Sequence, residues 1–285
     1  MENSVKFRKN SFKTKLVSML KVDFRRLLKS RLFYIMVGIA FVVPILIVVM
    51  ISMMEGSPVN DQYGNPLLDE FGNPVLMEGF KNAWQSIGQK SDEAMGGGAM
   101  AGGAAGAMDI TSMCNINLVF FAISVFICLF VADDFRSGYA KNLFTVRSKK
   151  SDYIISKTVV GFLVGTAMLL AYFIGSVLGG AITSLPFEVE GVTMANIFMC
   201  MMAKIFLMGV FTSIFVLISV VAKQRAWLSI CISLGGGMLL FMMIPMITPL
   251  DSTIVNVLLS LVGGIIFSVG LGAISNLILS KNNIL

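Results

Sequence analysis

The 285-residue sequence contains no histidine. That absence excludes Ser-His and Cys-His catalytic pairs, imidazole metal ligands and a histidine-based pH switch. Charged residues are also scarce, at 13% of the chain, whereas an ordinary soluble domain has about 25%. Apolar residues make up 56% and the mean hydropathy is +0.84, so they cannot all lie in one water-soluble core. The excess must face lipid, and the same composition excludes a disordered chain.

Catalytic and nucleotide-binding motifs are absent as well. The sequence contains no Walker motif, no HExxH zinc motif, no GxSxG nucleophile elbow and no kinase signature. The four cysteines lie in or beside apolar stretches without CxxC spacing, which indicates packing residues and neither disulfides nor a zinc site. We therefore expect a protein that is not an enzyme, binds no cofactor itself, and moves or binds another molecule.

Six apolar stretches are long enough to cross a membrane as helices. A bilayer core about 30 Å thick needs about 20 mainly apolar residues per helix. The predicted spans are Leu32–Met54, Met113–Ala132, Thr158–Leu185, Ala203–Ala222, Ala226–Thr248 and Thr253–Leu279. The predicted fold is an all-α membrane protein with six transmembrane helices in residues 32–285, preceded by a cytoplasmic segment, 1–31.

Lysine and arginine are divided unequally between the predicted loops. Residues 1–31 hold ten basic and two acidic residues, the 133–157 connection holds six and three, and the same side has Lys223, Arg225 and Lys281. The other side has two basic and eleven acidic residues. Because cytoplasmic loops keep the excess of positive charge, both termini are predicted to be cytoplasmic, and residues 55–112 to form an extracellular loop. The excess of basic residues is thus explained by the orientation of the chain in a lipid bilayer, expected to be a bacterial plasma membrane, and not by binding of nucleic acid.

Residues 1–31 are predicted to carry an amphipathic helix. Apolar residues recur at steps of three and four while basic residues occupy another face; the apolar set is Phe12, Leu16, Leu20, Phe24, Leu27 and Leu28, and the basic set is Lys13, Lys21, Arg25 and Lys29. Such a helix lies at the membrane surface with its basic face toward anionic headgroups. Two roles stay open, a topological anchor and a lever that also contacts a cytoplasmic partner.

The predicted extracellular loop contains an eight-residue repeat at 61–68 and 69–76, with Gly-Asn-Pro in each copy. Glycine adopts positive φ at little cost and proline fixes its own φ, so each copy is predicted to form a turn and the two copies to pair like a hairpin. Residues 94–108 are all Gly, Ala or Met. They are interpreted either as a flexible linker or as a helix whose small residues, at four-residue steps, pack against another helix.

The 133–157 connection is too short for a domain but carries a distinctive pattern. Asp133 and Asp134 are predicted to open a short helix by accepting its free N–H groups, and Gly138 permits close backbone approach. An apolar face among cations follows, made of Tyr139, Leu143 and Phe144. A mixed surface of this kind suits docking into a groove on another protein, and the alternative is a helix that lies on the membrane surface.

At these positions the chain resembles the membrane permeases of type-2 ABC exporters. In that family an acidic residue ends the second span, a glycine follows four residues on, and basic, aromatic and lysine positions lead into the third span. The corresponding residues here are Asp134, Gly138, Lys141, Asn142, Arg147, Ser148, Tyr153 and Lys157. The segment that ends at Arg31 is similar to the family's elbow helix, with Phe24, Arg25, Arg26, Lys29 and Arg31 as its members. The turn at 221–226 is similar to the family's connection between spans four and five.

The resemblance implies a permease that works with a second copy, or a related permease, and with two separate ATPase subunits. ATP and Mg would bind to those partners and not to this chain. Closure of the ATPase pair would then be transmitted to the spans by the coupling residues Asp134, Gly138, Tyr139, Lys141, Asn142, Leu143, Phe144 and Arg147. The implied function is ATP-driven export, and the apolar spans favour an amphipathic or hydrophobic cargo such as a peptide or a lipid-like molecule.

Lys204 is the one charged residue inside the predicted spans. If the fourth span begins at Ala203, the lysine extends to the outer headgroups, which is the interpretation that we favour. If the span begins near Met194, Lys204 lies about 15 Å deep and becomes a candidate for the substrate path, with Glu188 or Glu190 as partner.

Proline and glycine inside the spans predict local effects. Pro44 and Pro245 are predicted to kink their helices. Gly161 and Gly165, with the glycine runs at 235–237 and 263–264, are predicted to allow close contacts between helices.

Two other functions stay open. An ATPase-independent channel or secondary transporter predicts buried ionisable residues or broken helices near the membrane midplane. A non-transporting membrane scaffold or immunity protein predicts only that the outer loop binds a partner.

Overall fold

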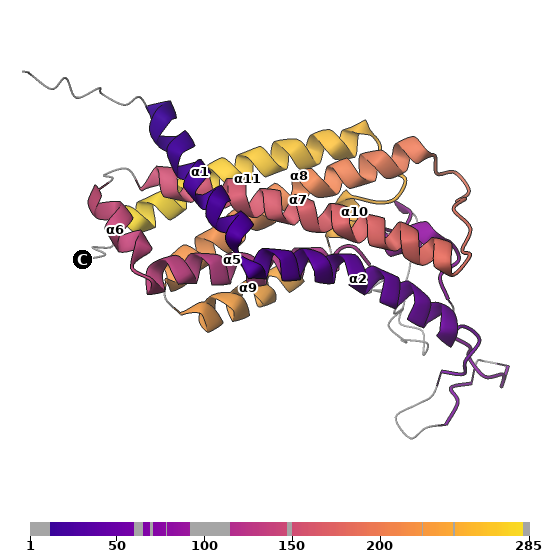
Figure 1. Ribbon diagram of the computed structural model, residues 1–285. Coiled ribbons are helices and arrows are strands. Elements are labelled where there is room, and N and C mark those ends of the chain that lie inside the picture. The colour runs from indigo at the N-terminus through magenta and orange to yellow at the C-terminus, as the bar shows by residue number, and fades with distance from the viewer. Residues whose placement is uncertain are drawn as a thin grey trace, which may run out of the picture.

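The computed structural model describes residues 12–59, 65–68, 71–77, 79–91, 115–146, 150–223, 225–241 and 243–281. Over these residues the chain is helical, with isolated β-bridges in two loops. The elements are α1 (Phe12–Lys29), α2 (Arg31–Met54), the short 3₁₀ helix η1 (Ala83–Ser86), α5 (Leu118–Arg136), α6 (Tyr139–Val146), α7 (Ser151–Ile182), α8 (Met194–Ala222), α9 (Ala226–Phe241), α10 (Ile244–Ile247) and α11 (Ile254–Lys281). The long helices lie side by side as a bundle (Figure 1).

Five of the described helices, α2, α5, α7, α8 and α11, are long and apolar enough to cross a membrane. They contain 19 to 32 residues and overlap five of the six predicted spans. The all-α architecture is therefore confirmed, and these helices indicate a multi-pass membrane protein. Helix α2 begins one residue earlier than predicted, at Arg31, and two helices begin much earlier, α7 at Ser151 and α8 at Met194. These earlier starts bring Lys157 into α7 and place Lys204 well inside α8.

The remaining predicted span, Ala226–Thr248, is interrupted. Helix α9 ends at Phe241 after 16 residues, and the four-residue α10 follows. At 1.5 Å per residue α9 alone is about 24 Å long, which is shorter than a bilayer core. Pro245 accounts for the break, because it has no N–H to donate to the carbonyl group of Phe241. Pro245 therefore ends a helix where a kink was predicted.

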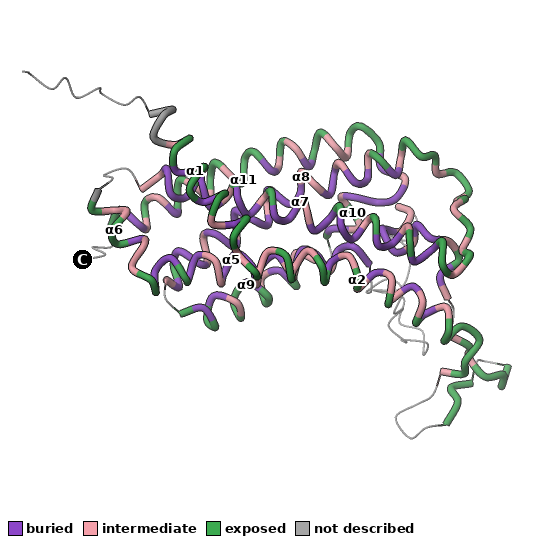
Figure 2. The backbone as a smooth tube through the Cα atoms, in the orientation of Figure 1, coloured by how far each residue is buried: buried purple, intermediate pink, exposed green. Residues whose placement is uncertain are grey.

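The core lies between α5, α7 and α8. Within their most apolar segments, 61% of the residues of α5 and of α8 are buried, against 11% for α11 and 22% for α2. Figure 2 shows the same contrast, with buried residues along the inner faces of the helices and exposed residues along α2 and α11. The exposed side chains of these two outer helices are mainly apolar, as lipid contact requires.

Small residues let the helices approach closely. A Cβ atom at Gly175 of α7 would lie 2.3 Å from the carbonyl oxygen of Phe41 in α2, and one at Gly264 of α11 would lie 2.8 Å from the carbonyl oxygen of Phe206 in α8. The predicted close contacts are confirmed at Gly161, Gly165 and Gly264. By contrast, no atom of the described residues lies within 4 Å of a Cβ built at Gly235, Gly236 or Gly263.

The two ends of the bundle differ in the elements that form them. One end, termed the basic end, contains α1, α6, the start of α7 and the C-termini of α5 and α11 (Figure 1). The Lys150 ammonium donates to the carbonyl oxygen of Leu279 at 2.6 Å, which fixes the last turn of α11 beside the start of α7. The first and last described helices, α1 and α11, therefore both reach this end of the bundle.

At the opposite end, a ring of backbone hydrogen bonds closes the repeat region. The N–H of Leu67 donates to the carbonyl of Val59, that of Val75 to Leu67, and that of Val59 to Val75, with N···O distances of 2.7, 2.7 and 2.8 Å. The predicted pairing of the two repeats is thus confirmed. A third copy, Gly56-Ser-Pro-Val59, completes the ring; sequence analysis missed it because serine replaces the asparagine. Gly72 has a φ of +81°, as the predicted turn of the second repeat requires, and Gly56 of the third copy has a φ of +77°. Gly64, the glycine of the other predicted turn, lies outside the described residues.

Residues 83–91, termed the plug segment, enter the same end of the bundle. The indole N–H of Trp84 donates to the carbonyl oxygen of Phe187 at 2.6 Å, and Ile87 is fully buried. The carbonyl of Gln89 accepts from the N–H of Leu250 at 2.7 Å, which joins the plug segment to the turn between α10 and α11. The two predictions for residues 94–108 concern residues outside the described part of the chain.

Candidate functional site

Helix α1 packs on the bundle through a narrow face. Met19, Asp23 and Leu27 are buried at four-residue steps. Phe24 and Leu28, which belong to the apolar stripe that was predicted to face the lipid at the membrane surface, are 44% and 45% exposed. The amphipathic helix is therefore confirmed, but the face that it turns to the bundle contains an aspartate. Most of the predicted elbow residues are exposed, namely Phe24, Arg25, Lys29 and Arg31, and Arg26 is half-buried.

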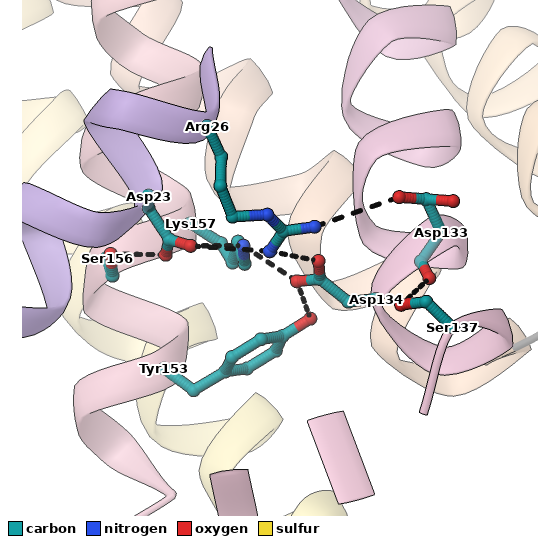
Figure 3. A network of polar contacts seen from close by, with 8 residues as sticks. All are labelled: Asp23, Arg26, Asp133, Asp134, Ser137, Tyr153, Ser156 and Lys157. Carbon is teal, nitrogen blue, oxygen red and sulfur yellow. Dashed lines mark hydrogen bonds and ion pairs between the residues drawn. The ribbon is translucent and has the colours of Figure 1, made fainter. Parts of the chain in front are cut away.

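Asp23 and Arg26 of α1 meet α5 and α7 in a cluster of buried charges (Figure 3). The Arg26 guanidinium lies 2.7 Å from Oδ1 of Asp134, a residue in the last turn of α5. The Lys157 ammonium, from the second turn of α7, lies 2.7 Å from Oδ2 of Asp134 and 3.0 Å from Oδ1 of Asp23. These four residues, Asp23, Arg26, Asp134 and Lys157, are termed the charge network.

Hydroxyl groups and aromatic rings complete the surroundings of the charge network. Tyr153 donates to Oδ2 of Asp134 at 3.0 Å, and Ser156 donates to Oδ2 of Asp23 at 2.6 Å. The guanidinium of Arg26 lies 4.3 Å from the ring centre of Tyr139, and the ammonium of Lys157 lies 4.2 Å from that of Phe130. Such contacts stabilise cations that have lost their water.

The charge network is electrically neutral, since two carboxylates face two cations. The side chains of Asp23 and Asp134 are fully buried and that of Lys157 is 1% exposed. Burial alone would lower the pKa of Arg26, but the carboxylates of Asp134 and Asp23 act together against it and the net pKa is raised. Burial, followed by the charge of Asp23, raises the pKa of Tyr139. At neutral pH the arginine is therefore charged and Tyr139 is neutral.

The predicted coupling residues lie in three different environments. Asp133 and Asp134 belong to the last turn of α5, so the prediction that they open a short helix is wrong; α6 begins at Tyr139, after Gly138 with φ of +73°. Leu143 and Phe144 pack against the core, and the Phe144 ring contacts that of Tyr153 at 5.4 Å. The exposed side chains of α6 include the coupling residues Lys141 and Asn142. Arg147 lies outside the described residues.

Lys204 lies deep in the bundle and is completely buried. Its ammonium donates to Oδ1 of Asn117 at 2.9 Å and to Thr248, at 2.9 Å for the hydroxyl and 3.3 Å for the carbonyl oxygen. The interpretation that we favoured from the sequence, a lysine at the outer headgroups, is wrong because α8 begins ten residues before it, at Met194. The contacts of the ammonium do not include the predicted partners, Glu188 and Glu190.

Sequence analysis missed Asp23 as a site residue. It counted this aspartate only as one of two acids in a basic segment. Its position between Met19 and Leu27, at four-residue steps on one helix face, is the signal that identifies it as buried. Ser156 and the Lys204 partners Asn117 and Thr248 carry no such signal, because their contacts join segments far apart in the chain.

Comparison with protein-family models, with curated proteins and with solved structures finds no match. Within the described residues, no group of three or more cysteine, aspartate or glutamate side chains is close enough to hold a metal ion. The charge network joins α1, α5 and α7 into one unit at the basic end, and Lys204 places a second cation inside the bundle.

Proposed function

We propose that the chain is the permease subunit of an ATP-driven transporter like the type-2 ABC exporters, and that it exports an amphipathic or hydrophobic cargo such as a peptide or a lipid-like molecule. The observation that carries this proposal is the charge network. It ties the surface helix α1, the end of α5 and the start of α7 together, directly beside α6. A force applied to α6 from outside the membrane would therefore reach three helices at once, as an externally driven transporter requires.

The exposed side of α6 is the proposed contact with the ATPase. Lys141, Asn142 and Thr145 are exposed, whereas Ala140 is fully buried and Phe144 packs on Tyr153. The polar side of the helix is thus free to bind a partner, and its apolar side holds it on the bundle. This assignment replaces the docking face of Tyr139, Leu143 and Phe144 that the sequence suggested.

In this proposal the basic end faces the cytoplasm of a cell with the chain in its plasma membrane. The excess of lysine and arginine at that end supports the orientation. Two ATPase subunits bind there and carry the ATP and Mg, while a second copy of the chain, or a related permease, completes the pathway. The lipid bilayer covers the exposed apolar faces of the outer helices.

The test is purification of the chain from its native membrane, followed by identification of bound proteins and an ATPase assay. A P-loop ATPase should co-purify and hydrolyse ATP. Lys141→Glu should reduce the amount of bound ATPase about tenfold or more, because reversal of this charge replaces an attraction to the partner with a repulsion. Thermal stability should stay unchanged, since Lys141 is exposed.

Lys281→Glu is the matched control, because Lys281 is also an exposed lysine at the basic end. It should leave the bound ATPase unchanged. An equal decrease of bound ATPase in both variants would mean that the overall charge of the basic end matters and that α6 is not the contact. Recovery of the chain as an assembly without any ATPase would contradict the proposed function itself.

A channel or secondary transporter is the second candidate, and one observation favours it. The chain has a buried cation, Lys204, next to the interrupted segment formed by α9 and α10, and both features are typical of transport sites inside membranes. This candidate predicts ion flux or exchange in vesicles that contain only this chain and no ATP. The exporter predicts no such flux.

A further inference from the structure

Lys204 is surrounded by neutral hydrogen-bond acceptors. Its three hydrogen bonds go to the side-chain oxygens of Asn117 and Thr248 and to the Thr248 carbonyl group. Among the described residues, no carboxylate lies within ion-pair distance of its ammonium, in contrast to Lys157, which has two. A buried ammonium without a counter-charge is unfavourable inside a membrane protein. A neutral side chain at position 204 could also bridge Asn117 and Thr248, and it would avoid the cost of a buried charge.

The local backbone increases the positive potential at this position. Asn117 is the residue that precedes the first turn of α5, a helix of 19 residues, and its side chain makes no capping hydrogen bond to that turn. The oxygen instead accepts from Lys204. The positive end of the helix dipole and the ammonium therefore lie together, an arrangement that repels two like charges and attracts an anion. The helix dipole and the ammonium each favour a negative charge next to Lys204.

We infer that Lys204 binds a carboxylate on the cargo, so that the transported molecule is an apolar compound with one carboxylate group. The inference rests on the proposed function, because it requires that the chain moves a cargo. The carboxylate replaces an oxygen of Asn117 or Thr248 and accepts the hydrogen bond from the ammonium. A single carboxylate matches the single ammonium, and the apolar remainder matches the same face of α8, on which Met201 and Met208, three residues before and four residues after Lys204, are buried.

The position of Thr248 explains how the ammonium becomes accessible. Thr248 follows the four-residue α10 and precedes the turn that Leu250 and Asp251 attach to the plug segment. A short segment between two breaks can shift without unwinding a long helix. Movement of α10 would thus release Lys204 toward the end of the bundle that the plug segment closes, and the cation would pass its ligand toward that end.

The experiment measures equilibrium binding to the full chain in lipid nanodiscs, without an ATPase. The probes are a fluorescent apolar tetrapeptide with a free C-terminal carboxylate and its C-terminal amide, and a fluorescent fatty acid and its methyl ester. The wild-type chain should bind the acid of at least one pair about 10- to 100-fold more tightly than its neutral form, as a charge-assisted hydrogen bond predicts. A preference within the peptide pair identifies a peptide cargo, and a preference within the other pair identifies a lipid cargo.

Two variants test the role of Lys204. Lys204→Met should remove the preference, while Lys281→Met, at an exposed lysine, should keep it. Asn117→Asp supplies a carboxylate from the chain itself; it should raise the thermal stability and also remove the preference, so the test does not depend on the folding of Lys204→Met. Equal or absent binding of both members of each pair by the wild-type chain, or a preference that survives in Asn117→Asp, would overturn the inference. This binding experiment needs no ATPase, so its outcome does not depend on whether an ATPase co-purifies with the chain. Failure of the inference and failure of the proposed function can therefore be told apart.

Discussion

The charge network makes a quantitative prediction about stability. Asp134→Asn leaves Asp23 to balance both Arg26 and Lys157, and Lys157→Met leaves two carboxylates with Arg26 alone. Each single substitution therefore creates one uncompensated buried charge, which typically destabilises a protein by about 3–5 kcal/mol. The double variant keeps Asp23 and Arg26, one charge of each sign, and is neutral again. Its destabilisation should be smaller than the sum of the two single values by about 0.5–3 kcal/mol.

Reversible unfolding in mixed micelles with increasing denaturing detergent, followed by tryptophan fluorescence, gives the four free energies that this cycle needs. Asp133→Asn is the matched control, because the neighbouring carboxylate has the same chemistry but is 71% exposed and lies 3.7 Å from Arg26. An exposed pair contributes at most about 1 kcal/mol, so this variant should unfold nearly like the wild-type chain. If the two single effects simply added, or if Asp133→Asn were as harmful as Asp134→Asn, the network would not act as a unit.

Two further predictions concern packing and pH. Gly175→Ala should destabilise the chain by about 1–3 kcal/mol, because its Cβ would lie 2.3 Å from the Phe41 carbonyl oxygen. Gly38→Ala should be neutral or stabilise by up to about 1 kcal/mol, because no described residue outside its own helix turn comes within 4 Å of the added Cβ; the same detergent titration measures both. Burial alone would raise the pKa of Asp251, but the hydrogen bonds from Ser91, aided by the residue's own backbone and by Lys90, lower it below its ordinary value of 3.8. A lowered pKa stabilises the folded state above pH 3.8 and loses this effect as the pH falls below it. Hydrogen exchange of the plug segment, corrected for intrinsic rates, should therefore increase below that pH, and less so in Ser91→Ala; an unchanged pH response in the variant would contradict this.

The long helices could be predicted from the sequence because apolar length is a local property. Two of their starting points could not, because the third span was predicted to begin directly after Lys157 and the fourth at Ala203, directly before Lys204. Lys157 belongs to α7 since Asp23 and Asp134 compensate its charge, and these residues lie 134 and 23 positions away in the chain. Lys204 belongs to the interior of α8 since Asn117 and Thr248 bind its ammonium. A charge in an apolar stretch can be judged only when its partners are known, and those come from the tertiary structure.

Part of the candidate site could also be predicted from the sequence. The resemblance drew attention to Asp134, Tyr153 and Lys157, which the fold brings together, and to Arg26 through the elbow helix. It did not indicate that Leu143 and Phe144 pack inward, because a short amphipathic helix has the same sequence pattern whether its apolar side meets its own bundle or a partner. The one sequence signal for the break after Phe241 was Pro245. Because membrane helices often tolerate proline, this signal could not distinguish a kink from the end of a helix.

The ring of backbone hydrogen bonds among Val59, Leu67 and Val75 restricts how this region can change length. Each repeat donates to one neighbour and accepts from the other, so the three hydrogen bonds form a closed ring. Removal of one repeat, or addition of a fourth, would leave an N–H and a carbonyl group without their partners. A different number of repeats would therefore require a different hydrogen-bond pattern in this loop.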